Sequence, residues 1–340
     1  MKAVQLVAWE SEPELREIPV PEPGPGEVLV AVAAAGLCHT DLHIMSWPPG
    51  TVPWRVPFTL GHENAGTVAA LGPGTRGAAI GDQVVVYGPW GCGSCRQCAR
   101  GAENLCPHRR GRGAGCGRDG GLAEHMLVPS TRLLVPIGDL DPVAAAPLTD
   151  AGLTSYHAIK QELPRLVAGT SAVVIGVGGL GHLAVQILRV LSPVRIVAVD
   201  PRPSSRALAL AAGAEAALDS NGLEAADLRT AAGGDAVLVL DFVGSDETLR
   251  LATSVLAMGG HLSVVGHGGG SLPGAFATLP FDTSVGRPSW GTIPELHEVV
   301  ALARSGSLSV EVERVGLDRA IDGYSRLRAG EIAARAVVVP

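Results

Sequence analysis

The chain has 340 residues, about twice the usual length of one domain, so we expect two compact lobes that each bury a core. It is 46% hydrophobic and 17% charged, and Gly, Pro or charged residues interrupt every apolar stretch before membrane-spanning length, so we expect no membrane partner. The net charge of −7 argues against a nucleic-acid partner, and the basic run at residues 109–112 is expected in a solvated loop. The N-terminus has no apolar signal core, which favours a cytoplasmic location.

The first part of the chain is expected to form a mostly β lobe. From residue 1 to about residue 148, short Val, Ala and Leu runs alternate with Pro and Gly; residues 23–32, for example, read Pro-Gly-Pro-Gly-Glu-Val-Leu-Val-Ala-Val. Residues 150–158 then have a helical pattern.

The second part alternates between strand-like and helix-like segments. The segments are 172–175, 181–191, 196–199, 204–212, 236–240, 246–256 and 261–265. Such alternation indicates βαβ units on a parallel sheet. After residue 280 we expect a connecting loop, a helix over 294–305 and a final strand at 336–339 that returns to the first lobe. The expected fold is therefore α/β, with a catalytic lobe at 1–147, a Rossmann-type doubly wound sheet at 148–283 and a return to the first lobe at 284–340.

A glycine-rich turn follows the first of these strands. Its motif residues are Gly176, Gly178, Gly179, Leu180 and Gly181. In a dinucleotide site the first glycine allows a tight turn, the second admits the pyrophosphate and the third lets the helix pack on the strand. The motif alone is weak, because a glycine-rich turn can also lack a ligand. Here the flanking strand and helix fit, so we expect a dinucleotide.

Two charged residues bear on which dinucleotide binds. Asp200 ends the next apolar run, nineteen residues after Gly181, where a carboxylate holds the adenosine ribose hydroxyls. Arg202 is a rival signal, since a nearby cation can receive the extra phosphate of NADP. We expect NAD, because Asp200 stands at the strand end itself.

Four cysteines lie within fifteen residues. They are Cys92, Cys95, Cys98 and Cys106. Thiolates at such spacings can surround one tetrahedral zinc ion and close its coordination shell, as in a structural site. Two disulfides would need an oxidising compartment, and a redox role for one Cys-x-x-Cys pair would leave the other two thiols unexplained. The spacing therefore predicts a structural zinc.

A second group of polar residues is spread along the first lobe. Cys38, His39, Thr40, Asp41 and His43 occur within six residues, and His62 and Glu63 follow Gly61. Singly, a cysteine or a histidine is more often an ordinary buried side chain than a ligand. Together they supply a soft ligand, a proton carrier and carboxylate acceptors, which favours a catalytic metal site.

With these motifs in place, the sequence resembles the zinc-containing medium-chain alcohol dehydrogenases, most closely the bacterial NAD-dependent secondary-alcohol dehydrogenases. The resemblance covers nearly the whole chain and rests on residues 61–63, the four-cysteine segment, residues 176–181 and Asp241-Phe242-Val243-Gly244. It implies a GroES-like catalytic domain, a small alcohol or carbonyl substrate, and reversible hydride transfer between a primary or secondary alcohol and NAD. It also implies a homo-oligomer, a dimer or tetramer, with the homotetramer as the expected form.

The resemblance also implies the ligands of a second, catalytic zinc. Cys38 and His62 would bind it, Glu63 would lie beside it as a transient ligand, and Asp41 would support His62. Many relatives have a third cysteine ligand where this chain has Asp150. Asp150 would then complete the site; the alternative is that it caps the helix that follows it.

Further residues gain roles by the same resemblance. Thr40 would take the substrate hydroxyl proton and pass it through the nicotinamide ribose toward His43, and His39 would lie near the coenzyme pyrophosphate. Residues 330–333 lack the arginine that some relatives place on the coenzyme phosphates, which leaves Arg335 as a candidate for that role. Cys116 has no expected role.

Other functions stay open from the sequence alone. Polyol and other zinc-dependent medium-chain dehydrogenases share these motifs, and zinc-independent members of the fold reduce quinones or enones. A non-catalytic nucleotide-binding protein would lack ligand or relay residues, whereas Thr40 and His43 are both present.

Overall fold

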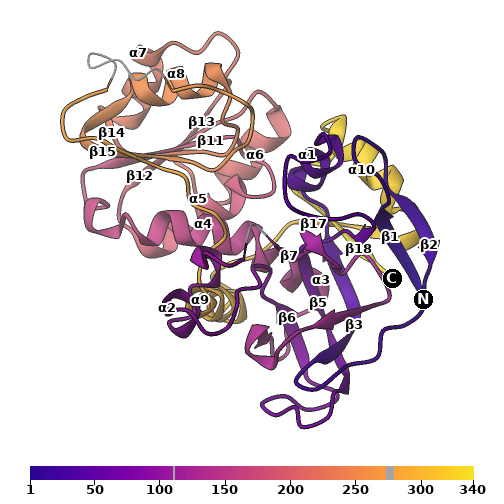
Figure 1. Ribbon diagram of the computed structural model, residues 1–340. Helices are drawn as coiled ribbons and strands as arrows, with labels where there is room; N and C mark the ends of the chain where they lie inside the picture. Colours follow the sequence, from indigo (N-terminus) through magenta and orange to yellow (C-terminus); the bar gives the residue numbers. More distant parts are fainter. Residues whose placement is uncertain (110–111, 273–278) are drawn as a thin grey trace. The chain divides into compact units, whose positions relative to one another are not determined.

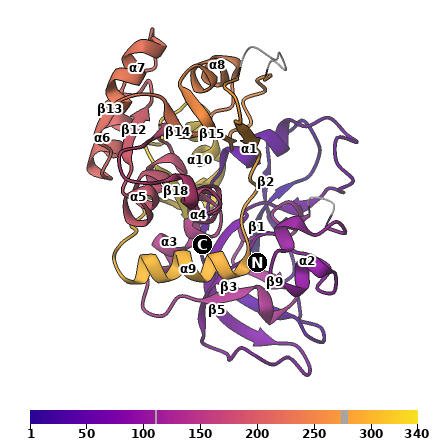
Figure 2. The same cartoon turned by 90° about the vertical axis from the view of Figure 1, so that its left-hand side faces the viewer.

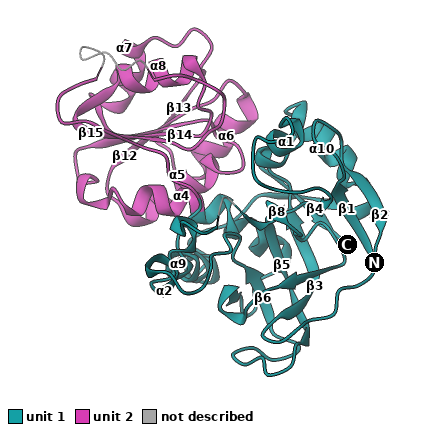
Figure 3. Cartoon of the chain, in the orientation of Figure 1, with its two compact units in different colours: residues 1–153, 290–340 teal, residues 154–289 magenta. Residues whose placement is uncertain are grey.

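The computed structural model describes residues 1–109, 112–272 and 279–340 (Figure 1). Arg110 and Gly111, the middle of the basic run, lie outside these ranges. The chain divides into two compact units, residues 1–153 with 290–340 and residues 154–289 (Figure 3). The boundaries expected from the sequence, after residues 147 and 283, stand six residues before these. Among the described residues, no helix has both the length and the apolar character that a membrane span requires.

The first unit is built mainly from strands. These are β1 (Lys2–Leu6), β2 (Glu14–Glu17), β3 (Val28–Gly36), β4 (Phe58–Thr59), β5 (Glu63–Leu71), β6 (Gln83–Val86), β7 (Gly113–Ala114), β8 (Gly117–Arg118), β9 (His125–Val128), β10 (Leu134–Pro136), β17 (Val312–Gly316) and β18 (Arg335–Val339). Its helices are α1 (His39–Ser46), α2 (Arg96–Ala99), α3 (Pro142–Ala145), α9 (Ile293–Arg304) and α10 (Ala320–Arg328), and α4 (Ala151–Lys160) begins in it. Short 3-10 turns lie at Glu103–Leu105, Thr131–Leu133, Ala146–Thr149 and Leu317–Arg319.

The main sheet of this unit joins the two ends of the chain. Its order is β10-β6-β5-β3-β18-β17, with β9 also on β3. The last strand returns to the first lobe, as the sequence predicted. Gly36 at the end of β3 faces both Glu63 on β5 and Val337 on β18. A Cβ at Gly36 would lie 1.9 Å from Glu63 Oε2, so only glycine lets this carboxylate lie against the strand. This register brings the end of β3, the start of β5 and the middle of β18 to one place.

Helix α9 illustrates how the local sequence sets an element's start. Thr292 precedes it, and its hydroxyl accepts a hydrogen bond from Glu295 N at 3.3 Å. Glu295 Oε2 accepts in return from Thr292 N at 2.7 Å, and Pro294 occupies the first turn. This capping box with an early proline satisfies the first free N–H groups, and the helix extends to Arg304 (Figure 2).

The second unit is a doubly wound parallel sheet. Its strands are β11 (Ser171–Ile175), β12 (Arg195–Val199), β13 (Ala216–Leu218), β14 (Ala236–Asp241), β15 (Leu256–Val264) and β16 (Ser284–Gly286), and its helices are α5 (Gly181–Leu191), α6 (Pro203–Ala211), α7 (Ala225–Ala232) and α8 (Asp246–Ser254), with a 3-10 turn at Leu163–Arg165. The order β13-β12-β11-β14-β15-β16 is parallel throughout. Strand β11 is buried along its whole length, since helices α7 and α8 lie over one face of the sheet and α5 over the other (Figure 1).

One boundary differs from the sequence prediction. The helix expected to reach residue 256 ends at Ser254, and β15 begins at Leu256, five residues before the expected start. A register shift between Ala236 and Leu238 on β14 lets the ladder extend to Leu256. A bulge of this kind depends on the neighbouring strand, and the periodicity of one segment does not reveal it.

The glycine turn of the second unit generates a stability prediction. A Cβ at Gly181 would lie 2.0 Å from Gly176 O, whereas a Cβ at Gly178 would meet nothing nearer than 3.7 Å. Gly181→Ala should therefore lower the free energy of unfolding by about 1–3 kcal/mol, because helix α5 must move off β11. Gly178→Ala is the matched control and should change it by less than about 0.5 kcal/mol. Thermal denaturation of both variants compares them, and equal midpoints would contradict this account of the turn.

Candidate functional site

Three potential metal ligands converge in the first unit. Cys38 follows β3, His62 precedes β5, and Asp150 precedes α4. Cys38 Sγ lies 3.8 Å and His62 Nε2 lies 3.5 Å from Asp150 Oδ2. All three ligand atoms lie within 4.8 Å of one another, and the Cys38 and His62 side chains are buried. The structure thus brings together the residues that the sequence assigned to the catalytic zinc.

These distances fit the geometry of zinc. In a tetrahedral site with a sulfur at about 2.3 Å and nitrogen or oxygen at about 2.0–2.2 Å, neighbouring ligand atoms lie roughly 3.3–3.7 Å apart. One soft thiolate, one imidazole and one carboxylate form a donor set that zinc accepts, and three protein ligands leave the fourth position for another molecule. The residues present therefore suit a catalytic rather than a closed site.

The charges around His62 also favour a cation. Burial alone lowers the pKa of His62, but the neighbouring Asp41, Asp150 and Cys38 outweigh burial and raise it well above its ordinary value. The acceptors around the imidazole therefore attract positive charge into their midst. A divalent ion would satisfy them while leaving the imidazole neutral.

Asp41 fixes the orientation of two of these ligands. Its Oδ1 lies 3.0 Å from His62 Nδ1, and its Oδ2 accepts from Cys38 N at 3.1 Å. Since a carboxylate only accepts, the proton of neutral His62 resides on Nδ1 and Nε2 keeps its lone pair for a metal. Tyr324, on α10, donates its hydroxyl to Asp41 Oδ2 at 2.9 Å. All of these groups are buried.

A buried ion pair lies beside the three ligands. Arg335 Nε donates to Glu63 Oε2 at 2.8 Å, and Arg335 Nη2 also contacts Glu63 Oε1. Glu63 Oε1 accepts from Ala151 N at 3.0 Å, so it satisfies an N–H at the start of α4. Arg335 Nη2 lies 3.7 Å from Asp150 Oδ2. Arg335, considered above for the coenzyme phosphates, is instead buried against Glu63 next to the ligand set.

The expected relay residues lie on helix α1. Cys38 Sγ is 3.6 Å from Thr40 Oγ1, so Thr40 stands next to the ligand set. His43 is half-buried, and burial lowers its pKa. His39 is the exposed first residue of the helix. Its expected contact with the coenzyme stays a prediction.

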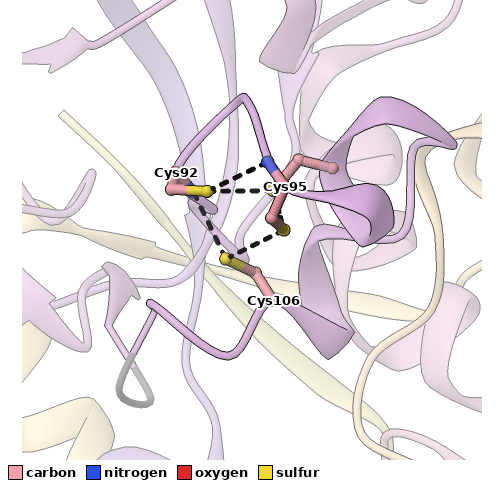
Figure 4. A group of neighbouring side chains, drawn as sticks. Cys92, Cys95 and Cys106 are labelled. Carbon is pink, nitrogen blue, oxygen red and sulfur yellow. Dashed lines mark hydrogen bonds between the residues drawn. The ribbon is translucent and has the colours of Figure 1, made fainter.

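The four cysteines gather at a second place in the first unit, and Figure 4 shows Cys92, Cys95 and Cys106 of this group. Cys95 Sγ lies 3.6 Å from Cys98 Sγ and 3.8 Å from Cys106 Sγ, and Cys92 Sγ lies 4.0 Å from Cys98 Sγ. Four sulfurs at about 2.3 Å from one tetrahedral zinc would be about 3.8 Å apart. The distances therefore match a ZnS4 centre, and all six cysteines of the chain are free thiols rather than disulfides.

The protonation of these thiols points to a cation as well. Hydrogen bonds from the N–H groups of Ser94 and Cys95 lower the pKa of Cys92 to about 6, whereas burial raises that of Cys98 to about 12. Without a cation the four sulfurs cannot all be thiolates near neutral pH. A zinc ion supplies the charge that deprotonates them together.

In the second unit the glycine turn has the geometry of a dinucleotide site. Gly176 follows β11 with a φ of 85°, and Gly181 begins α5. Gly178 lies between them, and a Cβ there would meet only Arg202 Nη2, at 3.7 Å. The turn thus presents a helix N-terminus and a bare backbone, the arrangement that receives a pyrophosphate. Gly179 and Leu180 lie between Gly178 and the start of α5, and their expected contact with the coenzyme stays a prediction.

Asp200 stands beside this turn, directly after β12, and its side chain is buried. Its Oδ2 accepts from Val177 N at 2.8 Å, which ties the carboxylate to the glycine turn. Arg202 Nε donates to Asp200 Oδ1 at 3.2 Å. The two rival signals for NAD and NADP are therefore an ion pair in this structure.

Comparisons with known proteins identify the family of this chain. A family model described as an alcohol dehydrogenase GroES-like domain matches residues 24–139, and one described as a zinc-binding dehydrogenase matches residues 179–305. The chain belongs to the zinc-binding alcohol dehydrogenases. Relatives include the D-arabinose 1-dehydrogenase (NADP(+)) of Saccharolobus solfataricus, 35% identical over 97% of this chain and 95% of that protein. An alcohol dehydrogenase of Geobacillus stearothermophilus is 32% identical over 99% and 98%.

Solved structures give the same family. The alcohol dehydrogenase of Aeropyrum pernix superimposes with a TM-score of 0.92 at 33% identity over 100% of both chains. The acetophenone reductase of Geotrichum candidum, solved in complex with NAD, gives a TM-score of 0.88 at 31% identity over 100% of this chain and 97% of that one. This dehydrogenase is accordingly a zinc-dependent oxidoreductase with a GroES-like catalytic unit and a Rossmann unit.

Three residues lie at the site through contacts that the sequence did not predict. Tyr324 and Arg335 reach the site from the C-terminal segment, more than 270 residues after their partners. Trp290 packs edge-on against His62, with ring centroids 5.9 Å apart, and fills the space that a side chain at Gly88 would take. No local motif marks them, because each acts through a contact that only the fold creates.

The expectation for the basic run was wrong at one residue. Arg109 was expected in a solvated loop, but its guanidinium lies 5.4 Å from the Trp290 ring centroid, and burial lowers its pKa. A cation over an indole face is stabilising when partly desolvated. Arg109 therefore belongs to the packing around the site rather than to the solvent.

The cysteine cluster generates a prediction about metal content. Cys95→Ser should remove one of two zinc equivalents and lower thermal stability, because a structural zinc contributes directly to the folding free energy of its lobe. Cys116→Ser is the matched control, since Cys116 is buried outside both ligand groups and should keep both zincs. Elemental analysis of the purified variants measures this. Two zincs in the Cys95 variant would remove that cysteine from the metal site.

Proposed function

We propose that this dehydrogenase transfers a hydride reversibly between a primary or secondary alcohol and NAD at a zinc ion held by Cys38, His62 and Asp150. The observation that carries the proposal is the convergence of these three ligand atoms within 4.8 Å. A thiolate, a neutral imidazole and a carboxylate balance the zinc charge, and a fourth position is left for substrate. Zinc bound there would act as a Lewis acid on the alcohol or carbonyl oxygen.

The chain's own residues would handle the proton. Thr40, next to Cys38, would accept the substrate hydroxyl proton, and His43 three residues later would release it to solvent. Burial keeps the pKa of His43 below its ordinary value of 6.5, so the imidazole is neutral and able to accept at neutral pH. Asp41 would hold His62 in place, and the Glu63–Arg335 pair would fix the ion's surroundings with Glu63 as a transient ligand.

NAD is the proposed coenzyme, with Asp200 as the acceptor for the adenosine ribose hydroxyls. A 2′-phosphate about 4 Å from ionised Asp200 would meet repulsion of roughly 4 kcal/mol per unit charge at an effective dielectric near 20, before Arg202 offsets any of it. NAD in the acetophenone reductase supports this choice, and the NADP named for the D-arabinose relative marks the alternative. His39 is proposed to lie near the pyrophosphate.

An apolar substituent on the substrate is favoured over a polyol. The Trp290 indole stands against His62, so a large apolar ring lies next to a proposed zinc ligand. A polyol chain would need polar partners at that position. The alternative of a zinc-independent quinone or enone reductase leaves the convergence of Cys38, His62 and Asp150 without a purpose.

A cytoplasmic homo-oligomer, a dimer or tetramer, is proposed as the working form. Free thiols at every cysteine suit a reducing compartment. In the second unit the sheet order ends at β16, and Met258, Phe281 and Val285 around it are 75%, 73% and 41% exposed. An open strand edge with such apolar side chains favours pairing with a second copy, and a homotetramer would join two such pairs.

The ligand role of Asp150 can be separated from helix capping. Asp150→Asn keeps much of the ability to cap a helix but loses the anionic ligand. We expect loss of one zinc or at least a 100-fold fall in turnover, with NADH binding retained and partial recovery in Asp150→Cys. Zinc analysis, steady-state rates and NADH fluorescence measure these. Two zincs with an unimpaired rate in the Asn variant would leave Asp150 as a cap.

The proton relay predicts a pH dependence. Because burial lowers the pKa of His43, alcohol oxidation should fall as pH drops through that pKa, below 6.5, where the imidazole becomes protonated. His43→Gln should lower turnover most at and below neutral pH, by ~10–100-fold, with partial rescue by small buffer bases, and Thr40→Val should be more damaging. Turnover measured across pH tests this. Equal wild-type and His43-variant profiles would exclude His43.

The proposed association has its own test. Phe281→Glu should shift the protein to a smaller species, because a charge on the apolar edge opposes its burial. Ile80→Glu is the matched control, since Ile80 is 68% exposed but lies in the other unit. Light scattering after size-exclusion chromatography gives the masses. Unchanged mass in the Phe281 variant would move the interface elsewhere.

A further inference from the structure

The carboxylate of Asp200 has no acceptor capacity left in this structure. Its Oδ1 accepts from Arg202 N at 2.9 Å and from Arg202 Nε at 3.2 Å. Its Oδ2 accepts from Val177 N at 2.8 Å and from Arg202 Nη2 at 3.4 Å. A carboxylate offers about four lone-pair sites, so two ribose hydroxyls can bind only if donors leave.

Only one of these donors can leave without moving the backbone. Val177 N belongs to the glycine turn and Arg202 N to the residue that precedes α6, so main-chain geometry fixes both. The Arg202 guanidinium is different, because it sits on a long side chain that is 36% exposed and its Nη2 contact is long. Ribose hydroxyls would therefore replace the guanidinium on Asp200.

The guanidinium also lies beside the glycine turn that is proposed to bind the pyrophosphate. A Cβ at Gly178 would lie 3.7 Å from Arg202 Nη2, so this nitrogen lies beside the glycine that admits the pyrophosphate. Released from Asp200, the guanidinium would stay within one side-chain length of the ribose. A guanidinium at that distance suits the dianionic oxygens of a 2′-phosphate.

Neighbouring charges leave this task to Arg202. Arg206 Nη1 donates to the carbonyl oxygens of Asp200 and Pro201 at 2.9 and 2.8 Å and pairs with Asp219 at 3.1 Å. It therefore braces the strand end. Across these side chains two cations face two carboxylates, so a 2′-phosphate would not enter a purely negative field.

We propose that Arg202 is a movable latch on Asp200, which yields to the ribose of NAD and turns to bind the 2′-phosphate of NADP. The dehydrogenase then accepts both coenzymes, with NAD preferred and the NADP share determined by Arg202. This inference rests on the proposed coenzyme site at Asp200. The latch makes opposite predictions for the two coenzymes. Without the Arg202 guanidinium, the ribose hydroxyls of NAD no longer compete with it for Asp200. The 2′-phosphate of NADP then lacks a positive partner.

The test measures binding to the full-length protein, independent of turnover. NADH and NADPH are titrated by fluorescence, and 5′-AMP and 2′-AMP serve as probes that separate the ribose from its 2′-phosphate. In Arg202→Ala, the dissociation constant should fall for NADH and rise for NADPH. The NADPH-to-NADH ratio of dissociation constants should therefore rise at least about tenfold. Arg202→Lys, which keeps the charge, should retain part of the 2′-AMP binding. Arg195→Ala, an exposed charge loss on β12, is the control and should leave the ratio within twofold of wild type.

Three results would overturn the latch. The first is a ratio that moves less than threefold in the Arg202→Ala variant. The second is NADH binding that weakens in that variant, which would make Arg202 a pyrophosphate or ribose ligand. The third is an equal shift in the Arg195 control, which would reduce the effect to net charge. Failure of the wild-type protein to bind either coenzyme would instead overturn the proposed site at Asp200.

Discussion

The catalytic unit depends on one buried carboxylate. Asp41 accepts hydrogen bonds from Cys38 N and the Tyr324 hydroxyl and pairs with His62 Nδ1, so a single side chain joins the end of β3, the start of β5 and helix α10. A buried charge is tolerated only when such partners surround it, and removing one leaves the others unsatisfied. The same bonds that stabilise Asp41 fix the thiol and imidazole that would hold zinc. Folding and ligand geometry are therefore one constraint.

Two ion pairs, one in each unit, differ in how easily they can be broken. The buried Glu63–Arg335 pair compensates itself, and its guanidinium also lies 3.7 Å from Asp150 Oδ2. Breaking a buried pair by removing one partner costs about 3–5 kcal/mol, so loss of either residue would strongly destabilise the fold. In the second unit only Arg202 of the Asp200–Arg202 pair is partly exposed, and buried Asp200 keeps hydrogen bonds from Val177 N and Arg202 N when the guanidinium leaves. One ion pair holds a metal's surroundings, while the other is weak enough to exchange for a ligand.

The sequence predicted what is local. The spacing of Cys92, Cys95 and Cys98 and the glycine turn each fix a chemistry within one segment, and the alternation of strands and helices gave the second unit its class. The contacts that the sequence did not predict depend on how the strands are paired in the sheet. Arg335 meets Glu63 because β18 and β5 both flank β3 at Gly36, and Tyr324 reaches Asp41 across 283 residues. The short elements β13 and α7 were not predicted either, because Ala-rich segments of this length carry little periodicity.

Zinc K-edge X-ray absorption can show directly whether Cys38, His62 and Asp150 hold a zinc ion. The measurement uses the Cys95→Ser variant, whose remaining zinc should be the catalytic one. We expect a shell with one sulfur at about 2.3 Å and nitrogen or oxygen ligands at about 2.0–2.2 Å. A shell of mainly sulfur, or one with no sulfur at all, would contradict the assignment.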